Sequence, residues 1–105
     1  MIDCYRETED GTVEPCELRD LFDKRWKMKT KMGDVEISTV FLAFNHAYLD
    51  TDLPVLWETM IFGGEHDEYV ERYTSRAAAI VGHTKAVAMV AGTRYLLSLE
   101  KEQAK

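Results

Sequence analysis

The chain has 105 residues, enough for one domain, and 46% of them are apolar, enough for one core. A net charge of −6 argues against nucleic-acid binding, which needs a basic surface. There is no apolar run long enough to span a membrane, no N-terminal secretory signal, and only two cysteines. We therefore expect a soluble cytoplasmic protein with reduced thiols and no cofactor.

The N-terminal third predicts a small hairpin followed by a short helix. Ile2–Arg6 is typical of a short strand, and Asp10-Gly11 marks a turn after which the chain returns near Thr12–Val13. Pro15 suits a first helical turn, and Cys16–Asp23 has a partial apolar stripe that favours a short helix.

The middle of the chain predicts an antiparallel sheet. Trp26–Met32 alternates apolar and charged residues, as a half-exposed strand does. Glu36–Asn45 and Pro54–Phe62 are rich in β-branched and aromatic residues and are apolar on both faces, which is typical of central strands. Glu68–Tyr73 predicts one more strand.

Glu58 is the one charged residue inside the second central strand, where an unpaired carboxylate would be costly. The simplest register places it opposite Val40, on the same face as His46. It is either satisfied by a partner such as an Arg or held for binding or proton transfer, and the sequence leaves both interpretations open.

The C-terminal third predicts one long helix from Arg76 to about Glu100, capped by Thr74-Ser75. We expect its main apolar stripe to lie across the sheet. The stripe consists of Ala77, Ile80, Val81, Thr84, Val87, Ala88, Ala91, Tyr95 and Leu99. A second patch around Gly82 and Leu96 suggests self-association.

The expected fold is a single α+β domain over residues 1–105, with about four antiparallel strands, a long C-terminal helix on one face and a short N-terminal helix.

Three segments resemble a family of small bacteriophage and prophage proteins. Relatives read STVWLGLDH where this chain has Ser38–His46, FETMVFGG where it has Trp57–Gly64, and RYST followed by a helical Gly-His pair where it has Arg72–Ser75 and Gly82-His83. The chain departs from that pattern at Ala43, where relatives have Gly, and at Asn45, where they have Asp. The resemblance implies a phage or prophage context and no particular activity.

These observations favour a phage accessory protein that binds a host or defence component in the host cytoplasm, as a homo-oligomer, rather than an enzyme. One alternative is a protein that sequesters a small molecule such as a signalling nucleotide, with Lys27, Lys29, Arg72 or Arg76 meeting phosphate. The other is a metal-dependent enzyme using His46, Glu58 and His83, although their spacing matches no metal motif. The candidate site residues are His46, Glu58, His83, Asn45, Trp57, Arg72 and Arg76.

Overall fold

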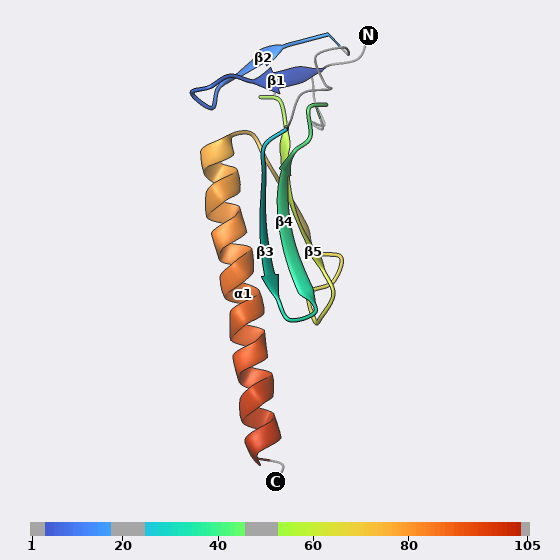
Figure 1. Ribbon diagram of the computed structural model, residues 1–105, viewed down its shortest axis with the longest axis vertical. Helices are drawn as coiled ribbons and strands as arrows, with labels where there is room; N and C mark the ends of the chain where they lie inside the picture. Colours follow the sequence, from blue (N-terminus) through green and yellow to red (C-terminus); the bar gives the residue numbers. More distant parts are fainter. Residues whose placement is uncertain (1–3, 18–24, 46–52, 104–105) are drawn as a thin grey trace.

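The computed structural model describes residues 4–17, 25–45 and 53–103, and it has the expected α+β class (Figure 1). A four-stranded antiparallel sheet, a separate two-stranded hairpin and one long helix make up the described chain. The elements are β1 (Tyr5–Glu7), β2 (Val13–Pro15), β3 (Lys27–Met32), β4 (Val35–Phe41), β5 (Trp57–Phe62), β6 (Val70–Tyr73) and α1 (Arg76–Gln103).

The large sheet is a meander in the order β3-β4-β5-β6, so that each strand pairs with its neighbour in the chain. The register confirms the sequence prediction, because Val40 lies opposite Glu58. Strand β4 is shorter than expected. It ends at Phe41, and Ala43 then adopts a left-handed φ of 69°, which a regular strand does not allow.

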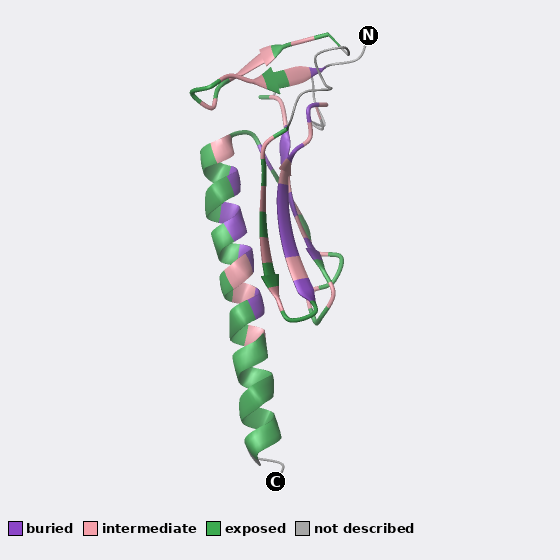
Figure 2. Cartoon of the chain, in the orientation of Figure 1, coloured by how far each residue is buried: buried purple, intermediate pink, exposed green. Residues whose placement is uncertain are grey.

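Helix α1 covers one face of the sheet and buries Ile37, Phe41, Trp57 and Ile61 beneath it. Ser75 caps the helix, since its Oγ accepts a hydrogen bond from the Ala78 N–H at 3.1 Å. The residues of α1 that are buried are Ala79, Gly82, His83, Ala86 and Val90. They recur at helical spacing and form the side of the helix that faces the sheet (Figure 2).

The expected orientation of the helix is therefore wrong. Ile80 and Tyr95, which we expected in the core, are 39% and 65% exposed, and Val81 is 62% exposed. The apolar stripe is present, but most of it lies on the side of α1 away from the sheet. The side of α1 that faces the sheet contains mostly small residues instead, and these allow the helix to lie close to the strands.

The C-terminal part of α1 runs past the end of the sheet (Figures 1 and 2). Every residue from Arg94 to Glu102 is exposed, and Tyr95, Leu96 and Leu97 are among the large exposed apolar side chains. We call residues 94–103 the overhang. Its apolar residues are distributed around the helix, so the overhang exposes apolar surface where a solvated helix end normally carries polar residues.

The hairpin β1-β2 is present and rests above the start of α1 (Figure 1). Arg76 connects the two, because its NH1 lies 3.4 Å from Glu7 Oε2. The helix expected over Cys16–Asp23 is not seen: Pro15 belongs to β2, Cys16 and Glu17 have no regular structure, and the other positions lie outside the described residues.

Candidate functional site

A polar cluster lies between α1 and the sheet, in an otherwise apolar interface. His83 Nδ1 is 2.7 Å from Thr39 Oγ1, and His83 Nε2 is 2.8 Å from Thr30 Oγ1. Thr39 Oγ1 is also 2.6 Å from Thr59 Oγ1. A neutral imidazole donates from one nitrogen and accepts at the other, so both threonines can be satisfied at once. Burial lowers the pKa of His83, which favours this neutral form.

Gly82 lets Tyr73 of strand β6 approach the helix backbone. A Cβ at Gly82 would overlap the Tyr73 hydroxyl and ring, so only glycine fits beside this side chain. Burial raises the pKa of Tyr73, which keeps the phenol protonated. The Gly-His pair on the helix thus has a structural explanation: the glycine admits Tyr73, and the histidine bonds to the sheet.

Glu58 and Arg72 lie on the other face of the sheet, which we call the open face because α1 does not cover it. Their side chains are directly opposed on β5 and β6, and Arg72 Nε donates to Glu58 Oε2 at 2.9 Å. Of the two interpretations of Glu58, the structure supports the carboxylate paired with an arginine. The metal set of His46, Glu58 and His83 is not assembled, because the sheet separates Glu58 from His83.

The remaining candidates are placed as follows. His46 lies outside the described residues, so its expected position on the same sheet face as Glu58 stays a prediction. Asn45 Oδ1 accepts a hydrogen bond from the Val55 N–H at 2.9 Å, which joins the two ends of the connection between β4 and β5. Trp57 is a core residue that packs against Phe41 with ring centroids 5.3 Å apart. Arg76 pairs with Glu7 rather than facing a ligand.

A small pocket of about 170 Å³ opens where the turn after β5 meets α1. Its apolar residues are Val35, Val90 and Leu97, and its polar residues include His66 and Arg94. His66 Nε2 is 2.7 Å from Thr93 Oγ1, which joins the turn to the helix. The volume is below that of ordinary ligand pockets, so the site could hold one ring or a small anion.

The side of α1 opposite the sheet is a second candidate, as an interaction surface. Its residues are Ala77, Val81, Thr84, Ala88, Ala91, Tyr95 and Leu99, and all are exposed. We call them the outward helix face. They recur at spacings of three or four residues and continue into the overhang, a pattern typical of a helix that packs against another helix.

Among the described residues, no three His, Cys, Asp or Glu side chains are grouped so that they could hold a metal ion. In the same part of the chain, no helix has the length and apolar character that crossing a membrane requires. Comparison with protein-family models, curated proteins and solved structures gave no match.

Proposed function

We propose that this protein acts by binding, as a homodimer held together through the outward helix face. The observation that carries the proposal is the exposure of Val81 and Tyr95, at 62% and 65%, on the outward helix face, which is apolar apart from Thr84. Contiguous exposed apolar surface of this kind marks interaction sites in soluble proteins. The resemblance to phage and prophage proteins supports a host or defence component as the further partner.

A second copy of the chain fits this surface in shape. If two α1 helices pack antiparallel with Ala88 at the centre, Val81 of one copy lies level with Tyr95 of the other, since each is seven residues from Ala88. The small side chains of Ala88 and Ala91 allow the axes to come close, while the larger residues on both sides fill the space between the helices. Such a two-fold arrangement uses the same surface on both copies.

Charge supports the same arrangement. The first turn of α1 contains no acidic residue, although acids are favoured there by the exposed N–H groups. In the antiparallel pair, the exposed Glu102 of one copy comes level with Thr74, at the start of the partner helix. Each helix would therefore receive an acidic side chain from its partner at the end where its own first turn contains none.

Sedimentation equilibrium at roughly tens of micromolar, where a dimer of micromolar affinity is populated, tests the proposal with two matched variants. Val81 and Val70 are both exposed valines, but Val70 lies on the open face of the sheet. We expect the wild type and V70E to be dimers and V81E to be a monomer, because the new carboxylate is buried against the partner.

A wild-type monomer, or a dimer that V70E dissociates and V81E leaves intact, contradicts the proposal. Metal analysis of the same samples separates the binding protein from the enzyme alternative. A stoichiometric metal in the purified wild type would favour the metal-dependent enzyme.

The pocket beside Arg94 supports a second candidate function, the binding of a small anionic molecule. The guanidinium is at the pocket edge and its NH1 also donates to the Met32 carbonyl at 3.3 Å, so its position is fixed for a phosphate or carboxylate. Calorimetric titration with inorganic phosphate tests this candidate. Binding by the wild type that R94Q loses and R72Q retains supports it, and no heat with the wild type rules that anion out.

A further inference from the structure

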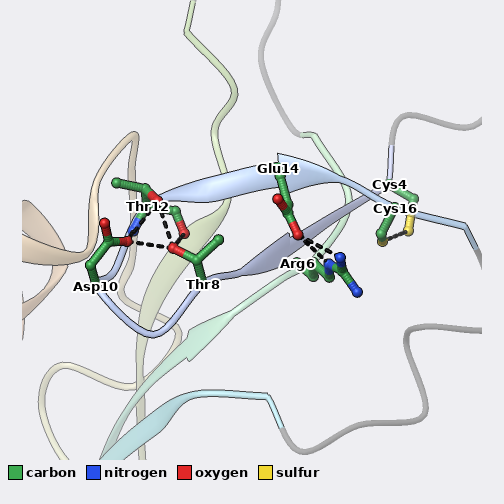
Figure 3. A network of polar contacts seen from close by, with 7 residues as sticks. All are labelled: Cys4, Arg6, Thr8, Asp10, Thr12, Glu14 and Cys16. Carbon is green, nitrogen blue, oxygen red and sulfur yellow. Dashed lines mark hydrogen bonds and ion pairs between the residues drawn. The ribbon is translucent and has the colours of Figure 1, made fainter.

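Cys4 and Cys16 face each other on the N-terminal hairpin (Figure 3). They continue the register of β1 and β2, in which Tyr5 lies opposite Pro15, and the Cys16 N–H donates to the Cys4 carbonyl at 3.0 Å. The sulfur atoms are 2.7 Å apart. The two thiols are therefore direct neighbours across the hairpin.

We propose that these two thiols are a redox site that forms a reversible disulfide within the chain. Opposed residues of this hydrogen-bonded type have Cα atoms about 5.5 Å apart, inside the range that a disulfide spans. Oxidation therefore requires no rearrangement of the hairpin backbone. The proposal goes beyond the binding function and does not depend on it.

The oxidant is a low-molecular-weight disulfide of the glutathione class. Cys16 is the half-buried thiol and Cys4 is 5% exposed, so the thiolate of Cys16 attacks the external disulfide and releases one thiol. The thiolate of Cys4 then attacks Cys16 Sγ in the mixed disulfide and releases the second thiol. The protein loses two protons and two electrons, and the oxidant takes them up and is reduced to two thiols.

The crosslink would stabilise the part of the hairpin that contacts the rest of the molecule. The Tyr5 N–H donates to the Ala43 carbonyl at 2.7 Å, and Cys4 forms an isolated β-bridge with Phe44. Ala43 directly precedes this bridge and has a left-handed φ. A disulfide between Cys4 and Cys16 would thus fix the start of β1, which contacts Ala43 and Phe44 just after β4. Reduction of the disulfide would remove this constraint.

Incubation of the folded protein with oxidised glutathione, followed by intact-mass and peptide analysis, tests the site. We expect the wild type to lose both free thiols and to yield a peptide pair linked through Cys4 and Cys16. C4S should instead accumulate one glutathione adduct on Cys16, and C16S should react much more slowly because its remaining thiol is buried. Reversal by dithiothreitol is expected for each product.

A second readout distinguishes an internal crosslink from a mere reactive thiol. The oxidised wild type should have a higher Tm than the reduced wild type, whereas the double variant C4S/C16S should have the same Tm under both conditions. Two free thiols after prolonged oxidation of the wild type, or crosslinks only between chains, overturn the proposal. Since both assays report on thiols, neither outcome depends on whether the helix dimer forms.

Discussion

Thr39 and His83 join the centre of the sheet to the long helix, with 2.7 Å between Thr39 Oγ1 and His83 Nδ1. Burial lowers the pKa of His83 below that of an unfolded histidine, about 6.5. As pH falls through that value, the unfolded chain binds a proton before the folded one does. The contribution of His83 to stability is therefore fully present above about pH 7 and is lost as the solution becomes more acidic.

The first prediction is that the free energy of unfolding of the wild type falls between about pH 7 and pH 5 by more than that of H83Q. Glutamine keeps a donor and an acceptor but does not titrate in this range. Urea denaturation at a series of pH values measures the difference. Identical pH dependence in the two proteins would show that His83 is not held neutral by burial.

The second prediction concerns the two glycines of α1. G82A should lose about 1–3 kcal/mol, because its Cβ would overlap the Tyr73 ring and force it to move. G92A should gain up to about 1 kcal/mol from helix propensity, since no atom lies within 4 Å of the added Cβ.

Chemical denaturation of both variants provides the comparison, and each is the control for the other. Equal effects at the two positions would mean that Tyr73 does not pack against the helix backbone as described.

The third prediction concerns backbone strain at Glu68, which is exposed and has a φ of 73°. A left-handed conformation costs a non-glycine residue about 1–2 kcal/mol. E68G should therefore stabilise the protein by about 1 kcal/mol, while E65G, in the same turn and also exposed, should not. Thermal denaturation of both variants decides the point, and a gain in E65G alone contradicts it.

The fourth prediction concerns the pair on the open face. The Arg72 side chain is 49% exposed and the Glu58 side chain 12%, so in E58Q the arginine can still reach water, and the loss should be no more than about 1 kcal/mol. E36Q on the same face is the control for a general loss of charge. Comparison of the two by urea denaturation measures the contribution of the pair. A loss of several kcal/mol in E58Q alone would contradict this prediction.

The order of strands and the register could be predicted because they depend on local patterns. Alternating side chains give the faces of each strand, and a single pairing of the two central strands places Val40 opposite Glu58. The pairing of Cys4 with Cys16 does not follow from the Asp10-Gly11 signal alone, because a two-residue turn would oppose Glu9 and Thr12 and so shift the register by one residue. The observed loop closes between Thr8 and Thr12, where the Thr8 N–H donates to the Thr12 carbonyl at 2.8 Å, and this register opposes the two cysteines.

The side of α1 that meets the sheet could not be read from hydrophobicity. A ranking by apolar character selects the stripe with Val81 and Tyr95, whereas the buried side contains Gly82, His83 and Ala86. Burial here depends on fit and on hydrogen bonding. The Tyr73 side chain occupies the space beside Gly82, and His83 bonds to two hydroxyl groups, one from β3 and one from β4. Neither contact is visible before the strands are placed in space.

The order of the meander has a consequence for synthesis on the ribosome. Among the described residues, β3, β4, β5 and β6 pair with their chain neighbours. Each strand can therefore join the sheet soon after it emerges, without waiting for a distant partner. Helix α1 emerges last. Until it does, the face with Ile37, Trp57 and Ile61 is open to water, and the nascent chain passes through an interval in which it can aggregate or recruit a chaperone.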